Sequence, residues 1–297
     1  MYIRNIMQDE FRSGFLVTTD RKKIWEKELE ILDQFAAICA RHGWHWWAAY
    51  GTLLGAVRHQ GFIPWDDDVD VYMARPEYQA FQQVAAEELS APFVFQNAHN
   101  SQMLYAFSKI RNLETMAIEF PDAPRYPQGI FIDIFPLDAV PDGSSTEQDL
   151  VYALEKELWM LTVQKDQFLD LCAKGSYVPQ MPENEIQAVA RMTKVQRFSV
   201  FEELAASSWG STQLVHDLVT DMTEGKGRFP VSLLDETAVV PFEQTQMPVF
   251  RAYDAALESY YGDWRTFQRG TSDHEGLLMS ADVPYTEYFR QMEQCGR

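Results

Sequence analysis

Four carboxylates lie within five positions of the segment RHQGFIPWDDDVDVYM, residues 58–73, and their neighbours are mostly apolar. They are Asp66, Asp67, Asp68 and Asp70. If the chain is extended here, Asp68 and Asp70 point to one face and Val69 and Val71 to the other. Converging carboxylate oxygens suit Mg²⁺ or Mn²⁺, and Mg²⁺ keeps positions for water and substrate phosphates. We therefore predict a divalent cation site at Asp68 and Asp70.

A third carboxylate, Asp133, lies in the apolar run GIFIDIFPLD. Ile130, Ile132 and Ile134 share one face of a strand, which places Asp133 on the other face. Because burying an unpaired charge is expensive, Asp133 is expected to meet a metal ion, a basic side chain or backbone donors.

Several nearby residues have chemistry suited to a phosphate-containing substrate. We expect a tight turn at the motif GTLLG, where Gly51 and Gly55 would let a ligand approach the backbone closely. Amide N–H groups in such a turn can bind phosphate oxygens. Arg58, Lys109 and Arg111 supply positive charge near the predicted site, with ordinary salt bridges as the alternative role for each.

Two further residues and one competing motif have open interpretations. His59 is either an acid or base near neutral pH or a positioning residue, and Trp65 either stacks on a ligand or belongs to the core. A calcium-binding loop would place Asp66, Asp68 and Asp70 at its positions 1, 3 and 5. Its sixth position requires glycine, whereas this sequence has the β-branched Val71, so we disfavour that motif.

The elements that must position these residues follow from hydrophobic periodicity. The first half indicates mixed α/β structure and the second half mostly helices, with a break in the Pro-, Gly- and Ser-rich segment 136–145. We predict two regions, a catalytic core over 1–140 and a mostly helical region over 141–297 that completes the core and the acceptor site. The predicted helices are 20–43, one starting near Pro76, 150–171, 183–207 and 249–261. The predicted strands are 44–50, 67–73, 93–96, 104–111, 115–119 and 130–135.

Composition excludes several classes of function. The chain has 297 residues, 46% of them hydrophobic, and a formal net charge of -19, which argues against nucleic acid or an anionic membrane as the main partner. Its three cysteines lack the spacing of a thiolate zinc site. No apolar run has the length of a membrane span, so a cytoplasmic location is expected, with at most peripheral contact with a lipid-linked acceptor.

Longer motifs indicate a family. YGTLLGAVRHQGFIPWDDDVDVYM, followed by SKIRNLETMAIEF, GIFIDIFPLD, VVPFE and YYGDW, closely resembles the LicD family of phosphotransferases, which is related to the fukutin group. The resemblance implies an α/β (α+β) nucleotidyltransferase-like fold, a mixed-sheet core with helical additions. In such folds a Gly-Thr turn binds donor phosphates, two aspartates in D-x-D bind the metal and a third comes from a neighbouring strand. Those roles map onto Gly51 and Thr52, Asp68 and Asp70, and Asp133.

The resemblance also implies the reaction. Family members transfer a phospho-alcohol, often phosphocholine, from a CDP-linked donor such as CDP-choline to a sugar hydroxyl of a glycan or glycolipid. We expect a metal-dependent transferase that releases CMP, with Asp133 receiving the hydroxyl proton. The alternatives are a nucleotidyltransferase and a catalytically silent ligand-binding protein of the same fold. The tail YYGDWRTFQRGTSDHEG lacks the prolines usual in relatives but keeps Arg265, Arg269 and His274.

Overall fold

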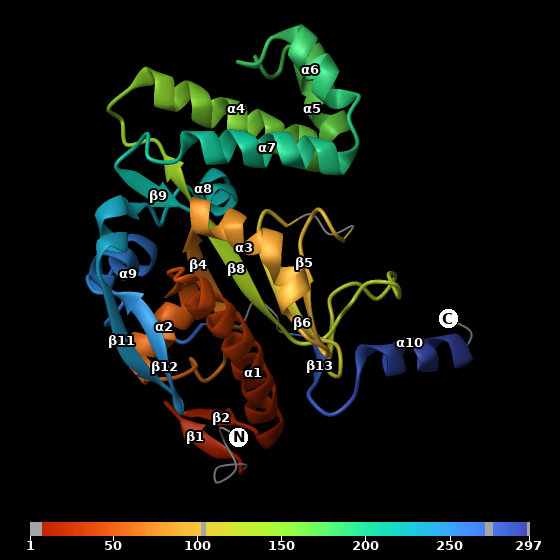
Figure 1. Cartoon of the computed structure of the whole chain (residues 1–297), viewed down its shortest axis with the longest axis vertical. Coiled ribbons are helices and arrows are strands. Elements are labelled where there is room, and N and C mark those ends of the chain that lie inside the picture. Colours follow the sequence, from red (N-terminus) through yellow and green to blue (C-terminus); the bar gives the residue numbers. More distant parts are fainter. Residues whose placement is uncertain (1–7, 102–104, 271–275, 296–297) are drawn as a thin grey trace.

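The structure of the chain, a computed structural model, describes residues 8–101, 105–270 and 276–295 (Figure 1). At its centre lies the strand β8 (Phe131–Val140), and every residue of this strand is buried. Among the described residues, the central sheet has seven strands. The other six are β3 (Trp47–Ala48), β4 (Asp70–Ala74), β5 (Phe93–Gln96), β6 (Ser108–Asn112), β9 (Leu214–His216) and β10 (Phe229–Pro230). The predicted mixed α/β architecture is confirmed.

Strand β8 organises the sheet because three strands pair with it. It runs parallel to β4 and antiparallel to β6 and β9. Helices α1 (Thr19–His42) and α3 (Arg75–Glu88) contact β8 and lie in front of the sheet in Figure 1. Alternation along β8 divides the two faces: Ile132 and Ile134 have no exposed surface, and Asp133 and Phe135 have the opposite parity.

Helix α1 forms where periodicity predicted it. Its N-cap Thr18 accepts a hydrogen bond from the backbone N–H of Arg21, and Gly43 ends the helix at φ 71°. Trp25 and Phe35, on its apolar stripe, are almost completely buried. This helix therefore covers the sheet from one side.

The segment predicted as strand 44–50 followed by a tight turn has a different structure. Only β3 is extended, and helix α2 (Tyr50–His59) begins directly at the motif GTLLG. Tyr50 accommodates the change of direction with a positive φ of 41°. Gly51 consequently lies in the first turn of a helix.

The helical segment between β8 and β9 projects from the sheet at the top of Figure 1. It contains α4 (Thr146–Val163), α5 (Lys165–Ala173), α6 (Glu183–Ala190) and α7 (Lys194–Ser208). Each long helix predicted here is divided in two, because Gln164 leaves helical geometry and Thr193 starts α7 with a capping box. The chain leaves the sheet at Val140 and returns at its register partner Leu214.

The remaining elements surround this centre. They are β1 (Glu10–Arg12), β2 (Phe15–Val17), β7 (Met116–Ile118), α8 (Leu218–Glu224), the 3₁₀ helix η1 (Val231–Asp235), β11 (Thr237–Phe242), β12 (Thr245–Phe250), α9 (Tyr253–Tyr261), β13 (Leu278–Ser280) and α10 (Tyr285–Gln294). The strands β9 to β13 lie in the half that we expected to be mostly helical. The helix predicted over 249–261 starts later because β12 pairs with β11 as a hairpin. Among the described residues, no helix combines the length and the apolar character needed to cross a bilayer.

Candidate active site

One row of side chains crosses three neighbouring strands. Asp70 on β4 is the register partner of Asp133 on β8, and Lys109 on β6 is the partner of Asp133 on its other side. Their exposed fractions are 9%, 6% and 2%, so the row is buried. The structure therefore brings together two of the three predicted aspartates from segments far apart in the sequence.

Asp70 and Asp133 of this row line a cavity of about 580 Å³, whose other lining residues come from the sheet, from α2, α8 and α9 and from the segments between them. The predicted residues that line it are Gly51, Arg58, Asp68, Asp70 and Asp133. Four predicted residues are described but are not among its lining residues, namely Thr52, His59, Lys109 and Arg111. His274 of the tail lies outside the described residues.

The buried carboxylates of Asp70 and Asp133 lie in an environment that disfavours their charged forms unless a cation is nearby. Burial raises the pKa of Asp70 well above its usual range, and repulsion from Asp68 and Asp133 adds to the shift. Burial also raises the pKa of Asp133, opposed by the ammonium of Lys109. A positive ion beside these groups would favour their charged forms.

The oxygen atoms present fit a hard divalent cation of the Mg²⁺ type. Lys109 Nζ donates a hydrogen bond to Asp133 Oδ2 at 3.1 Å, whereas the buried Oδ1 accepts none, although Nζ is 3.0 Å away. In the described part of the chain, no three His, Cys, Asp or Glu side chains are arranged to hold a metal ion. Mg²⁺ in phosphate-transferring sites commonly uses only one or two protein carboxylates, together with water and phosphates. Asp70 and Asp133 match that smaller set.

The backbone of Asp70 is fixed by residues from α2. Thr52 Oγ1 accepts a hydrogen bond from the Asp70 N–H at 2.9 Å, and both residues are buried. The structure thus places the Thr52 hydroxyl behind Asp70. A Cβ atom on Gly51 would lie 2.6 Å from Asp66 Oδ2, so any other residue at this position would displace the Asp66 carboxylate.

Lys109 and Arg111 form salt bridges, which was the alternative role expected for them. Lys109 Nζ lies 3.3 Å from Glu119 Oε1, and Arg111 pairs with the same carboxylate. Arg111 also donates to Gln96 Oε1 at 2.6 Å. Glu119 was not among the predicted site residues, although it lies in the motif SKIRNLETMAIEF.

His59 has the environment of a positioning residue. Its Nε2 accepts a hydrogen bond from Arg58 Nε at 3.1 Å. Burial, followed by the positive charge of Arg58, lowers the pKa of His59 to about 4, so the imidazole is neutral at pH 7. Trp65 lines the cavity and also packs edge-on against Phe267, so it belongs both to the core and to the site.

The far side of the cavity comes from the C-terminal half and was largely missed. Tyr260, Tyr261 and Lys226 line it, as does Arg269 from the tail. The motif YYGDW, residues 260–264, was the available signal for the tyrosines. Arg265, by contrast, is half exposed and pairs with carboxylates on α9.

Comparisons with known proteins identify the class and then the family. A family model described as LicD/FKTN/FKRP, nucleotidyltransferase domain, matches residues 43–173, which include the strands that carry Asp70 and Asp133. The chain is 30% identical over 253 residues to the lipopolysaccharide cholinephosphotransferase LicD of Haemophilus influenzae, covering 80% of this chain and 88% of that protein. The chain belongs to the LicD family, as its motifs predicted. An uncharacterized protein of Rickettsia typhi is 33% identical over 90 residues, covering 28% of this chain and 29% of that protein.

Proposed function

We propose that this chain transfers phosphocholine from CDP-choline to a sugar hydroxyl of lipopolysaccharide and releases CMP. The observation that carries the proposal is the pairing of Asp70 with Asp133 at the border of the cavity. Membership of the LicD family supports a phosphotransferase, and the name of the Haemophilus influenzae relative supports both the transferred group and the acceptor.

A divalent cation, Mg²⁺ or Mn²⁺, would be held by Asp70 and Asp133, with Asp68 on the same cavity. When bound, it would offset negative charge on the donor diphosphate. Of the chain's own cations, Arg58 and Arg269 line the cavity and are suited to bind phosphate oxygens. Lys109 would keep Asp133 in position through the ion pair described above.

In the proposed reaction, the acceptor hydroxyl attacks the phosphorus that carries the choline. A bond forms between the sugar oxygen and this phosphorus while the bond to the CMP oxygen breaks in line with it. Asp133 Oδ1, which accepts no hydrogen bond from the residues that the structure describes, receives the hydroxyl proton. The leaving group departs as CMP.

The test is incubation of the protein with Mg²⁺, a panel of CDP-alcohols and lipopolysaccharide that lacks phosphocholine, followed by mass spectrometry. We expect CMP and an acceptor that has gained phosphocholine, with no product in EDTA. A nucleotidylated acceptor would mean attack at the other phosphorus, and full activity without divalent metal would remove the cation from the proposal. Donor binding without any product would support a silent binding protein instead.

A further inference from the structure

Two tyrosines, Tyr50 of α2 and Tyr260 of α9, form one side of the cavity, and we call this pair the aromatic wall. Their rings are perpendicular, with centroids 4.9 Å apart and an interplanar angle of 86°. The Tyr50 ring also packs against Phe135 at 5.2 Å. Phe135 follows Asp133 by two positions on the same face of β8, so the aromatic wall begins beside the aspartate pair.

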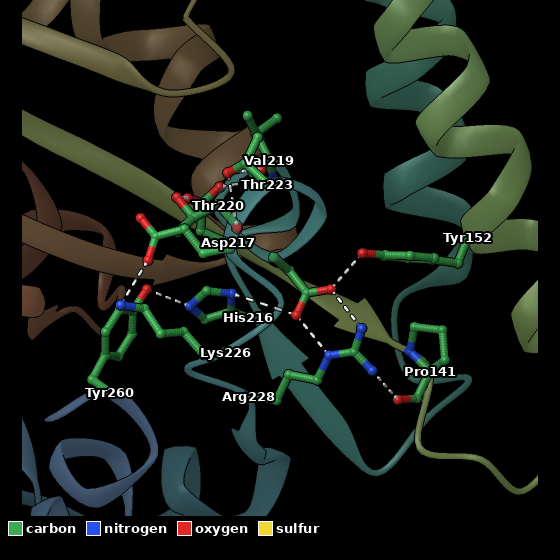
Figure 2. Close-up of polar contacts among 12 residues, drawn as sticks. Pro141, Tyr152, His216, Asp217, Val219, Thr220, Thr223, Lys226, Arg228 and Tyr260 are labelled. Carbon is green, nitrogen blue, oxygen red and sulfur yellow. Dashed lines mark hydrogen bonds and ion pairs between the residues drawn. The ribbon is translucent and has the colours of Figure 1, made fainter. Parts of the chain in front are cut away.

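The hydroxyl groups of the aromatic wall are bound by the protein from behind. Tyr50 donates a hydrogen bond to Asp217 Oδ2 at 3.0 Å. The Tyr260 hydroxyl lies 2.6 Å from His216 Nε2 (Figure 2). Burial lowers the pKa of His216 to about 4, so the ring is neutral at pH 7. Its Nδ1 faces Asp221 Oδ1 at 3.9 Å, and a proton on Nδ1 leaves Nε2 to accept from Tyr260. The rings, more than the hydroxyl groups, are therefore what the aromatic wall offers to a ligand.

The support behind the aromatic wall is itself fixed. Figure 2 shows Tyr152, Arg228 and His216 converging on one carboxylate, which belongs to Asp221. Arg228 donates to both of its oxygens at 2.6 and 2.7 Å, and the Tyr152 hydroxyl donates to one of them at 2.6 Å. Groups held in this way keep one orientation, so the aromatic wall is a preformed surface.

Carboxylates predominate on this side of the cavity. Glu224 and Asp263 line it, and the buried Asp217 lies behind Tyr50. Lys226 also lines the cavity, and its charge and that of Glu224, 3.1 Å away, offset each other. Asp263 and Asp217 supply the remaining negative charge on this side. Aromatic faces combined with nearby negative charge favour a cation that has no hydrogen-bond donors to satisfy, such as a quaternary ammonium.

We propose that the aromatic wall binds the trimethylammonium group of the donor and makes the protein prefer choline over neutral alcohols. This inference rests on the proposed function, because the ammonium belongs to the phosphocholine that is transferred. The site places that group next to Asp70 and Asp133, where its phosphate reacts. Tyr50 and Tyr260 are thus the residues that determine donor specificity.

Isothermal titration calorimetry with Mg²⁺ and no acceptor tests this without requiring turnover. CDP-glycerol serves as the neutral donor for comparison with CDP-choline. We expect wild-type protein to bind CDP-choline about tenfold more tightly, consistent with a desolvated cation–π contact. Tyr260→Leu should lose this preference, whereas Tyr260→Phe, which keeps the ring, should retain most of it. Tyr288→Leu, which removes a tyrosine ring from α10, is the matched control and should bind as wild type.

Three results would overturn the inference: no binding of CDP-choline, equal binding of both donors by the wild type, or equal weakening of both donors by Tyr260→Leu. The last result would mean that the ring contacts the cytidine part common to both. A thermal melt of Tyr260→Leu distinguishes loss of folding from loss of the donor preference. If the protein binds CDP-choline selectively but does not transfer phosphocholine, the inference about the aromatic wall stands. If it transfers phosphocholine without this binding preference, the proposed function stands and the inference fails.

Discussion

Asp70 and Asp133 are register partners on the adjacent parallel strands β4 and β8, so the backbone alone sets the distance between their Cα atoms. Both residues belong to the hydrogen-bonded strands themselves and not to a loop. The same row continues to Lys109 on β6. The two carboxylates that we expect to hold the cation are therefore held at a spacing set by the pairing of the two strands.

Asp70→Asn should abolish phosphocholine transfer while leaving the fold intact. The amide has the same shape, and it replaces a carboxyl group whose pKa is raised by burial and by repulsion from Asp68 and Asp133, so the fold does not depend on its charge. We expect Mn²⁺ affinity to fall by more than the ~10- to 100-fold typical of an outer-shell partner. Calorimetric Mn²⁺ titration and thermal melts check this, with Asp166→Asn on exposed α5 as control. Unchanged metal affinity and rate would place the site elsewhere.

Lys109→Met should reduce stability because it leaves Asp133 and Glu119 buried without their shared ammonium. Removing one partner of a buried pair costs ~3–5 kcal/mol. Urea unfolding measures the loss. Lys174→Met, which breaks an exposed pair with Asp170, should cost less than ~1 kcal/mol. If both variants lose the same small amount, the buried ion pair is not important for stability.

Glu155 on α4 should make the protein less stable as pH rises from about 5 to about 8. Burial, assisted by the charge of Asp138, raises the pKa of Glu155 from 4.5 to about 8. The contribution of Glu155 to the free energy of unfolding is therefore fully present below pH 4.5, the pKa of this group in the unfolded chain. Between the two values the unfolded chain has released the proton that the folded chain keeps, so the free energy of unfolding falls.

The slope should approach ~1.4 kcal/mol per pH unit over that interval. Urea unfolding at several pH values measures it. Glu155→Gln should remove most of the slope, while Glu147→Gln, on the exposed first turn of the same helix, should not change it. A wild-type slope in Glu155→Gln would contradict the assignment.

Gly227→Ala should damage the aromatic wall. A Cβ atom there would lie 2.5 Å from Tyr260 Cε2 and 2.8 Å from His216 Nε2. Gly225 also has a positive φ, but a Cβ atom on it would meet nothing within 4 Å. Gly225→Ala should therefore cost only the ~1–2 kcal/mol of left-handed backbone. Gly227→Ala should cost more and should also weaken CDP-choline binding, as measured by unfolding and calorimetry. Equal effects would mean that backbone strain alone matters.

The local parts of this structure were predictable from sequence. Strand β5 has the predicted bounds, and α1 differs from its predicted range by one residue at each end, because period and capping are local signals. Asp133 was identified because it is a carboxylate in an otherwise apolar run. The two-residue alternation then sufficed to place Asp133 and the isoleucines on opposite faces of β8.

Contacts that depend on tertiary packing were not predictable. Salt bridges were an expected alternative for Lys109 and Arg111, but only the fold brings both residues to Glu119. Likewise, Tyr260 reaches the cavity because α9 packs near α2, a relationship that no periodicity encodes. Gly51 was expected in a turn because the propensity of glycine does not distinguish a turn from the first turn of a helix.

The pairing of Val140 with Leu214 means that the chain leaves and re-enters the sheet at adjacent positions. Residues 141–213 are therefore an excursion whose length does not enter the geometry of the strands, and the entropy of closing such a loop grows only slowly with its length. Evolution can shorten, extend or exchange this excursion while the row containing Asp70 and Asp133 keeps its register. Tyr152, which belongs to this excursion, donates a hydrogen bond to Asp221 behind the aromatic wall. An exchange of the excursion would therefore still alter the cavity. Variation among relatives in this stretch should accordingly change which molecules are modified, and leave the chemistry of modification unchanged.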